Sequence, residues 1–350
     1  SGWVGDDDAT FNGLRGCMRK AIFSAWDGYT NYGCDIGGYR GQDESDKEVF
    51  LRWAQYGAFM PLMENGGGGE HRPWMFDEET TDIYRAFVQE HYRLIPYFMT
   101  TGMDAYDSDG SVTVVRPVAQ RDPSTPDYRL TEPSTLSYLL GDDLIVHPVA
   151  SRAEKKDSRG VKGSEVRMVF PSEGQVGDTS KWFSWWSPHD KSQAVEVPGG
   201  MEGGQVASFK FVPLDSMAVY VRQGALIPMQ RSAEDETVLF TWFNPSVDSE
   251  KEATVREPVS VGPGMVGTLS LSADGALAGS ISAHPGKGES GTGFGWVVVG
   301  VKEPENVSFK AADVSTCTHS YDTATLTLTA TCADASQGLL LQGFGVEVAY

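Results

Sequence analysis

The order of strand-like and helix-like segments over the first third of the chain limits its fold more than any other feature. Short apolar runs at Tyr32–Ile36 and Phe59–Met63 predict buried strands. Helical spacing of apolar residues predicts helices over Lys47–Phe59 and Thr80–Asp107, and we expect Pro96 to kink or end the second of them. Because strands that alternate with helices are typical of α/β domains with a parallel sheet, we expect such a domain over residues 1–107.

The residue pattern of the sequence changes at about residue 108. Short runs rich in β-branched and aromatic residues follow one another between Gly, Pro and Asp, which is typical of all-β structure. We expect one β-sandwich over residues 108–230. A second β-sandwich is expected over 231–350, where the clearest strands are Thr323–Thr331 and Leu339–Val348. The predicted fold class is therefore α/β plus all-β.

The charge of the chain excludes some partners. It carries 48 acidic and 28 basic side chains, with a formal net charge of −20. Such a surface repels phosphate backbones and anionic membranes, so we expect no nucleic acid partner and favour a neutral substrate. The sequence has no long uninterrupted apolar run, and we expect no membrane span.

The four cysteines, Cys17, Cys34, Cys317 and Cys332, show no CxxC or Cys/His spacing typical of zinc sites. We therefore expect no metal and no cofactor, and interpret the cysteines as buried thiols or as one or two disulfides. Cys317 and Cys332 flank two apparent strands and could pair. An N-glycosylation triplet at Asn306–Ser308 adds to the expectation of a glycoprotein that is secreted or lies in the lumen of the secretory pathway.

Three adjacent carboxylates, Asp6, Asp7 and Asp8, follow Trp3 near the start of the chain. One interpretation is capping of the helix that follows, because Asp and Thr10 both suit that position. Another is a catalytic acid beside Trp3, whose apolar wall would raise the pKa of a carboxyl group. Calcium binding is a third interpretation, although no EF-hand spacing follows.

Two further loops carry polar residues at the ends of expected strands. Asp35 ends one strand and is followed by Gly37 and Gly38, which let the backbone approach a ligand. The next loop, Glu64–Trp74, holds four consecutive glycines and His71. In a (β/α)8 barrel the carboxyl ends of the strands form the active-site face, so all these acids would lie on that face.

Over about residues 3–228 the order and spacing of these motifs resemble glycoside hydrolase family 31. The motifs are Trp3-Val4-Gly5-Asp6, Gly33-Cys34-Asp35-Ile36-Gly37-Gly38-Tyr39, Arg52–Phe59, Pro73–Phe76, Tyr92–Tyr97, Arg116-Pro117, Leu140–Val149 and Val221–Pro228. The resemblance implies the last part of a (β/α)8 TIM barrel followed by two β-sandwich domains.

The resemblance also implies an activity, that of a retaining, exo-acting α-glycosidase of the α-glucosidase type. In such enzymes an Asp nucleophile and an Asp general acid/base lie about 5 Å apart. Asp6 falls on the acid/base position. Asp35 falls on an acid that lines the sugar subsite, and Trp3 on an aromatic residue beside it. Trp74 matches a position that we expect to serve in packing.

The sequence departs from the family pattern in two ways. The nucleophile of the family lies on an earlier barrel strand, and the chain starts at Ser1, after that strand. We therefore expect a carbohydrate-processing enzyme that is completed by an N-terminal chain or segment of the same precursor. The family also carries a substrate-binding His soon after a Met-Arg-Asn-like run, whereas here Met63-Glu64-Asn65 is followed by glycines. Either His71 takes that role from a shortened loop, or the contact is lost.

Other functions remain open at this point. The chain could belong to a non-catalytic glycan-binding or structural protein on a degenerate glycosidase scaffold. A transglycosylase or an α-glucan lyase would be a close chemical variant of the hydrolase. Asp7 or Asp8 could take the role given to Asp6. The three tryptophans Trp182, Trp185 and Trp186 could form a sugar-stacking platform, although we expect most of them in a β-sandwich core.

Overall fold

The structure is a computed structural model of the chain. It describes residues 2–41, 46–118, 136–171, 181–196, 206–235, 237–246, 248–255, 265–283, 294–304, 306–310, 317–332 and 339–344. The chain divides into two compact units, made of residues 1–91, 104–180 and 196–220, and of residues 92–103, 181–195 and 221–350. Within the described ranges, no helix is both long enough and apolar enough to cross a membrane.

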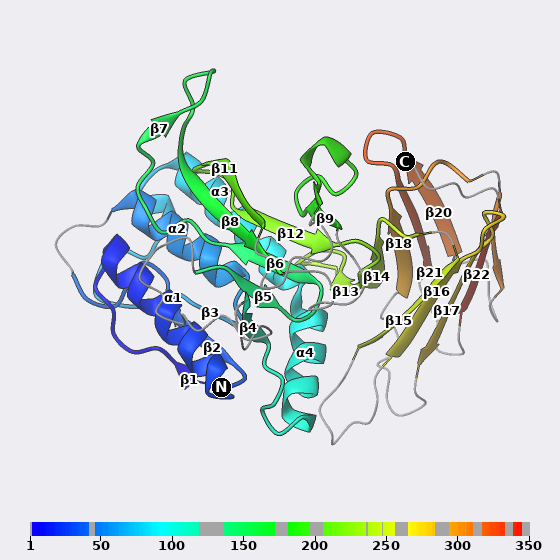
Figure 1. Cartoon of the computed structure of the whole chain (residues 1–350), viewed down its shortest axis with the longest axis horizontal. Coiled ribbons are helices and arrows are strands. Elements are labelled where there is room, and N and C mark those ends of the chain that lie inside the picture. The colour runs from blue at the N-terminus through cyan, green and yellow to red at the C-terminus, as the bar shows by residue number, and fades with distance from the viewer. Residues whose placement is uncertain are drawn as a thin grey trace. The chain divides into compact units, whose positions relative to one another are not determined.

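The first unit begins with a parallel sheet of three strands in the order β1-β2-β3. The strands are β1 (Gly2–Trp3), β2 (Tyr32–Asp35) and β3 (Leu62–Glu64), and the helices between them are α1 (Phe11–Trp26) and α2 (Lys47–Ala58). Both helices pack beside the sheet (Figure 1). Trp3 pairs with Gly33, and Asp35 pairs with Glu64, so the carboxyl ends of the strands meet at one edge. The α/β expectation is confirmed.

One predicted boundary is wrong for a local reason, and the expected effect of Pro96 on the long helix is confirmed. The strand expected at Phe59–Met63 begins only at Leu62, because the N–H groups of Phe59 and Met60 still bond to carbonyls of α2. The helix expected over Thr80–Asp107 is two helices, α3 (Glu78–Arg93) and α4 (Ile95–Asp107). Pro96 lacks an N–H group and its ring clashes with the preceding turn, so the chain starts a new helix there.

The rest of the first unit is β-structure. Its antiparallel strands include β4 (Val115–Pro117), β5 (Tyr138–Leu140), β6 (Leu144–His147), β7 (Lys155–Lys156), β8 (Lys162–Phe170), β11 (Val206–Pro213) and β12 (Ala218–Arg222). β4, β5 and β6 are successive neighbours in one sheet, and β12 follows β6. β8 lies between β11 and β7 in another sheet.

A buried arginine ties α2 to this β-structure. Arg52 is 1% exposed and donates to Gln55 Oε1 at 2.9 Å and to the carbonyls of Pro213 and Ser216 at 3.0 and 2.8 Å. Gln55 in turn donates to the carbonyl of Leu214 at 2.6 Å. The buried Nη1 of Arg52 and Nε2 of Gln55 thus have carbonyl acceptors in the turn, as buried polar groups require.

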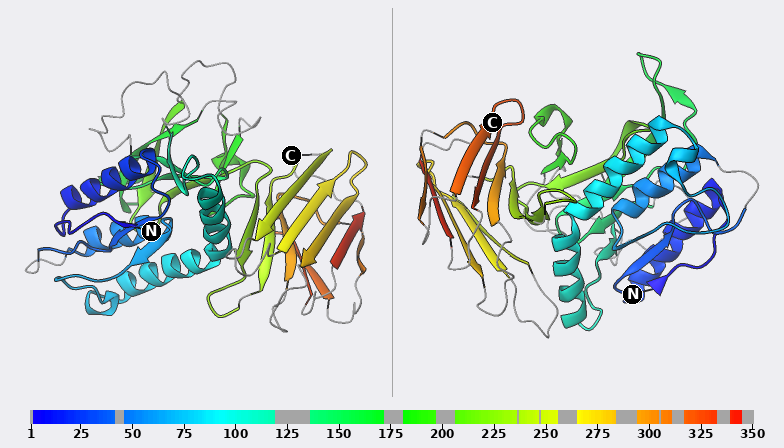
Figure 2. Two further views of the ribbon diagram at one scale, coloured as in Figure 1. Left: turned by 90° about the horizontal axis from the view of Figure 1, so that it is seen from below. Right: turned by 180° about the vertical axis from the view of Figure 1, so that it is seen from behind.

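The second unit contains β9 (Lys181–Ser184) and the first residue of β10 (Val195–Glu196), and is mostly a β-sandwich. One five-stranded sheet has the order β13-β14-β18-β21-β20 and the other β15-β16-β17-β22-β19. Their bounds are β13 (Leu226–Gln230), β14 (Val238–Phe243), β15 (Ser249–Val255), β16 (Met265–Leu271), β17 (Leu277–Ala283), β18 (Phe294–Val299), β19 (Asn306–Lys310), β20 (Cys317–Asp322), β21 (Thr327–Cys332) and β22 (Leu339–Phe344). Figure 2 shows the two sheets face to face.

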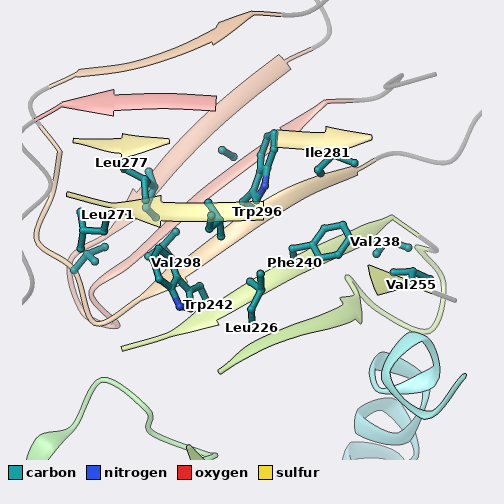
Figure 3. Close-up of a cluster of buried hydrophobic side chains, with 14 residues drawn as sticks. Leu226, Val238, Phe240, Trp242, Val255, Leu271, Leu277, Ile281, Trp296 and Val298 are labelled. Atoms are coloured by element: carbon teal, nitrogen blue, oxygen red, sulfur yellow. The ribbon is translucent and has the colours of Figure 1, made fainter. Parts of the chain in front are cut away.

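One apolar cluster fills the space between these sheets (Figure 3). Trp242 and Trp296 are 0% exposed at its centre, as is Phe240. A methyl group at Gly267 would lie 2.5 Å from the Phe240 ring, so this position has no room for a side chain. The expected second sandwich is thus present, and its first strand, β13, starts five residues before the predicted boundary at 231.

The cysteines and tryptophans of the β-structure follow the expectations. Cys317 is disulfide-bonded, and the residue opposite it in the β20–β21 ladder is Cys332. Trp182 and Trp185 are buried, as expected for core residues, whereas Trp186 is 38% exposed.

Candidate active site

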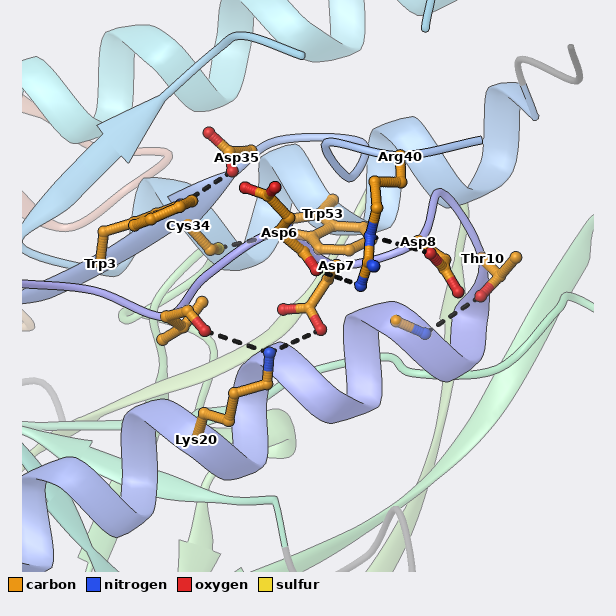
Figure 4. A network of polar contacts seen from close by, with 12 residues as sticks. Trp3, Asp6, Asp7, Asp8, Thr10, Lys20, Cys34, Asp35, Arg40 and Trp53 are labelled. Carbon is orange, nitrogen blue, oxygen red and sulfur yellow. Dashed lines mark hydrogen bonds and ion pairs between the residues drawn. The ribbon is translucent and has the colours of Figure 1, made fainter. Parts of the chain in front are cut away.

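Trp3 and Asp35 meet at the carboxyl edge of the parallel sheet. Trp3 ends β1 and Asp35 ends the neighbouring β2, and the indole Nε1 donates to Asp35 Oδ2 at 2.8 Å (Figure 4). The Asp35 side chain is almost buried, whereas Trp3 is 50% exposed. The hydrogen bond fixes the plane of the indole and leaves part of its surface open to a ligand.

Asp7 and Asp8 are both engaged by basic side chains. Lys20, on α1, places Nζ 2.7 Å from Asp7 Oδ1 and also donates to the carbonyl of Val4 at 3.1 Å. Arg40 Nε lies 3.3 Å from Asp8 Oδ1. These two carboxylates therefore fix the loop that follows β1 to α1 and to the loop that follows β2.

The Asp6 carboxylate differs from its two neighbours. Asp6 is exposed, and its carboxylate makes no hydrogen bond or ion pair with any residue that the structure describes. Its main-chain carbonyl is held by Arg40 Nη2 at 2.6 Å. None of the three acids caps α1, because Thr10 does so by accepting from the N–H of Gly13 at 3.0 Å. The loop therefore holds the Asp6 backbone and leaves the carboxylate available for chemistry.

The loops that carry Asp6 and Asp35 are joined along their backbones. The carbonyl of Asp7 accepts from the N–H groups of Tyr39 and Arg40 at 2.9 and 3.0 Å, and Ala9 donates to the carbonyl of Arg40 at 2.7 Å. Gly38 has φ +87°, and a methyl group there would lie 2.7 Å from Ala9 Cα. Only glycine fits at this crossing.

Two buried thiols lie behind the site. Cys17, on α1, and Cys34, next to Asp35, are both free and buried, and Trp53 Nε1 donates to Cys34 Sγ at 3.1 Å. Burial, with a smaller contribution from Cys34, raises the pKa of the Cys17 thiol well above its usual value. A protonated, buried thiol is a poor nucleophile, so Cys17 serves as packing.

His71 lies against the turn that follows Asp35. Its Nδ1 is 2.8 Å from the carbonyl oxygen of Ile36, and its own carbonyl accepts from Asn65 Nδ2 at 2.9 Å. Next to it, Arg72 lowers the pKa of Glu70 to about 2 through two hydrogen bonds at 2.7 Å. The structure thus brings Trp3, Asp35 and Asp6 to one edge of the sheet. His71, which belongs to the glycine-rich loop, lies beside the turn that follows Asp35.

Sequence reasoning did not find Lys20 and Arg40. Nothing in their local sequence marks them, because their partners lie 13 and 32 to 34 positions away. Trp74 was expected to pack, but it is 65% exposed in a short 3-10 turn (Pro73–Met75). No group of three or more His, Cys, Asp or Glu side chains that could hold a metal occurs among the described residues.

Comparison with known proteins shows which fold carries this site, the TIM barrel of a glycosidase family. Residues 1–101 match the TIM-barrel domain of glycosyl hydrolases family 31, and residues 111–227 match the C-terminal domain of the same family. The chain belongs to glycoside hydrolase family 31.

Curated relatives resemble the chain over most of its length. Human neutral alpha-glucosidase C is 28% identical over 67% of this chain and 22% of its own length. An alpha-xylosidase from Emericella nidulans is 24% identical over 73% of this chain and 30% of its own length. The chain therefore spans about a quarter of the length of these relatives.

Solved structures confirm the fold class over nearly the whole chain. A Flavobacterium johnsoniae GH31 dextranase complexed with glucose has a TM-score of 0.74 at 18% identity, over 98% of this chain and 44% of that chain. A cycloalternan-forming enzyme from Listeria monocytogenes, in complex with a pentasaccharide substrate, has a TM-score of 0.72 at 20% identity, over 99% and 32%. The fold is the last part of a barrel followed by β-domains.

Proposed function

We propose that this chain is part of a retaining, exo-acting α-glycoside hydrolase of the α-glucosidase type, with Asp6 as its general acid/base. One observation carries the proposal: among the described residues the Asp6 carboxylate has no partner, whereas the other two members of the carboxylate triplet are engaged by Lys20 and Arg40. An acid/base must give and take a proton freely, so a carboxylate held by a cation at its side is the poorer candidate.

In the proposed reaction, Asp6 protonates the glycosidic oxygen of the leaving group while a nucleophile attacks the anomeric carbon. Asp6, then ionised, takes a proton from the water that releases the sugar. Trp3 and Asp35 hold the terminal sugar, the first by its exposed indole face and the second through hydroxyl groups. His71 is included as a substrate-binding candidate beside the same turn.

The nucleophile is proposed to be an Asp on an N-terminal segment or chain of the same precursor. Retention requires two carboxyl groups about 5 Å apart on opposite sides of the sugar ring. The relatives are about four times longer than the region shared with this chain, which leaves room for such a segment. The substrate class is an α-linked glycan, because the names of the curated relatives include alpha-glucosidases and an alpha-xylosidase.

The leaving group of the substrate gives a sharp test of Asp6 in the complete enzyme. We expect Asp6→Asn to lower kcat/KM by about 10²- to 10⁴-fold on unactivated α-disaccharides, because their leaving groups need protonation. Activated aryl α-glycosides should lose far less in the glycosylation step. Asp8→Asn is the matched control, since it removes an equivalent charge two residues away. Equal, small losses of kcat/KM for Asp6→Asn on both substrates would show that another residue is the general acid/base.

Product analysis separates this proposal from its alternatives. A hydrolase releases the free sugar with the α configuration, a transglycosylase transfers it to a second sugar, and a lyase yields an unsaturated product. A complete protein that binds α-glucans without turning them over would instead be a glycan-binding protein on a glycosidase scaffold.

We also propose that the chain acts outside the cell or in the lumen of the secretory pathway. The disulfide at Cys317 supports this, because disulfides persist in oxidising compartments. The glycosylation triplet that starts at Asn306, in β19, is a second support. Removal of N-glycans from the native protein should lower its mass; an unchanged mass together with a cytosolic location would contradict the proposal.

A further inference from the structure

The histidine of the glycine loop has its two ring nitrogens in different surroundings. Nδ1 lies 2.8 Å from the carbonyl oxygen of Ile36, which can only accept, so Nδ1 carries the proton. Nε2 is buried and has no hydrogen-bond partner within the described part of the chain. A methyl group at Gly67 would lie 2.9 Å from Nε2, so the loop backbone covers that nitrogen closely. His71 therefore donates through Nδ1–H to the main chain, while its acceptor, Nε2, is covered by the loop backbone and has no partner among the described residues.

The carbonyl that His71 holds lies at the centre of the site's backbone network. The N–H of Ile36 bonds to the carbonyl of Glu64 at 2.9 Å, and the N–H of Gly38 bonds to that of Asp35 at 3.0 Å. The next two residues after Gly38, Tyr39 and Arg40, donate their N–H groups to the carbonyl of Asp7. A change at Ile36 is thus transmitted in one direction to Asp35 and in the other to the loop that carries Asp6.

The ring of His71 also supports this turn by packing. Gly37 has φ +87°, and a methyl group there would lie 3.6 Å from both Cε1 and Nδ1 of His71. The imidazole therefore lies flush against a turn that only glycine adopts without strain. A cavity of about 10 Å³, lined by Gly37, Gly69 and Phe50 among others, lies beside the ring. That volume holds at most one water molecule and is too small for a sugar hydroxymethyl group.

From this geometry we infer that His71 is a positioning residue: its Nδ1–H holds the carbonyl of Ile36 and thereby fixes Asp35 and the Asp6 loop for the terminal sugar. The inference rests on the proposed function and changes the role given there to His71. It acts through the turn, so the atom that matters is Nδ1, not Nε2.

Two amide substitutions separate this role from direct sugar binding. The amide nitrogen of Asn can take the place of Nδ1, and that of Gln the place of Nε2. We expect His71→Gln to lower kcat/KM by up to about 10²-fold, as small misplacements of catalytic groups do. His71→Asn should restore most of this loss. The reverse order, with His71→Gln active and His71→Asn impaired, would overturn the inference in favour of a direct contact through Nε2.

His91 provides a matched control. Its Nδ1 lies 3.1 Å from the carbonyl oxygen of Ala58, which ends α2 and so precedes β3 at the edge opposite to the site. His91→Gln removes the same type of hydrogen bond, and we expect it to leave kcat/KM within about twofold of the wild type. A loss as large as that of His71→Gln would show that any such histidine matters only for folding.

Hydrogen exchange tests the same inference without activity. In the same preparations, the amides of Ile36–Gly41 should exchange about tenfold faster in His71→Gln than in the wild type, and His71→Asn should restore protection. If the wild-type enzyme proved inactive, the proposed function would fail while this result still decided the role of His71. Unchanged exchange in His71→Gln would overturn the inference.

Discussion

Trp3 and Asp35 lie 32 positions apart in the sequence and are joined by a 2.8 Å hydrogen bond from the indole Nε1 to Oδ2. The bond exists because β1 and β2 are parallel neighbours that end at the same edge of the sheet. It orients an acid that is 6% exposed next to an aromatic ring that is 50% exposed. A sugar that lies on the ring would therefore meet the carboxylate in a fixed direction.

Trp3→Phe keeps the aromatic face and removes the N–H group. We expect kcat/KM of the complete enzyme to fall by about tenfold, because a hydrogen bond to a charged group contributes about 1.5–3 kcal/mol. Trp74→Phe is the control: Trp74 is 65% exposed, and its change should have no effect. Steady-state kinetics on one α-glucoside gives both values. Equal activity of Trp3→Phe and the wild type would show that the hydrogen bond has no part in binding.

Arg52 is predicted to be the most costly basic residue of α2 to replace. Burial lowers its pKa to about 10, which still leaves the guanidinium charged at neutral pH. Arg52→Met would leave the carbonyls of Pro213 and Ser216 without their donor, and we expect about 3 kcal/mol or more of lost unfolding free energy. Arg85→Met removes an exposed pair with Asp82 and should cost less than about 0.5 kcal/mol. Urea unfolding measures both, and similar midpoints for the two variants would contradict the prediction.

His147 should make stability depend on pH. Burial, with a smaller contribution from Lys210, lowers its pKa to about 3, and its Nδ1 lies 2.8 Å from Ser137 Oγ. The unfolded chain takes up a proton near pH 6.5, whereas the folded chain does not until about pH 3. This contribution to stability is therefore full above pH 6.5 and is lost as the pH falls from 6.5 towards 3, by at most about 1.4 kcal/mol per pH unit.

Urea midpoints measured between pH 7 and pH 4 test this dependence. His147→Leu should have a shallower decline than the wild type, although it is less stable at neutral pH. His319→Asn changes an exposed histidine and should keep the wild-type slope. The same slope in His147→Leu would assign the acid sensitivity to other groups.

The sequence predicted those parts of the fold that depend on local periodicity. The helix that starts at Lys47 has its capping residue, Asp46, directly before it, and its expected and observed ends differ by one residue. The break near Leu94 was expected from Pro96, because a proline ring interrupts a helix even where the apolar spacing runs through it. The start of β3 could not be predicted from a strand pattern, because it depends on the backbone hydrogen bonds of the last turn of α2.

The candidate site could be predicted only in part. Asp6, Asp35 and Trp3 were proposed from motifs that resemble the family, which put Asp6 on the acid/base position without excluding Asp7 or Asp8. The partners of Asp7 and Asp8, Lys20 on α1 and Arg40 in the turn after β2, could not be predicted, because the fold alone brings them to this loop. The direction of the His71 ring likewise depends on a contact with Ile36, 35 positions away.

The most direct test of the account is azide rescue of Asp6→Ala in the complete enzyme, with an activated aryl α-glycoside as substrate. Without the acid/base, no group takes a proton from the water that would hydrolyse the glycosyl-enzyme. Azide is an anion and can attack the glycosyl-enzyme without losing a proton. We expect faster turnover with azide and an α-glycosyl azide as the product. A β-glycosyl azide would make Asp6 the nucleophile instead, and no rescue of Asp6→Ala together with rescue of Asp7→Ala or Asp8→Ala would contradict the assignment of Asp6.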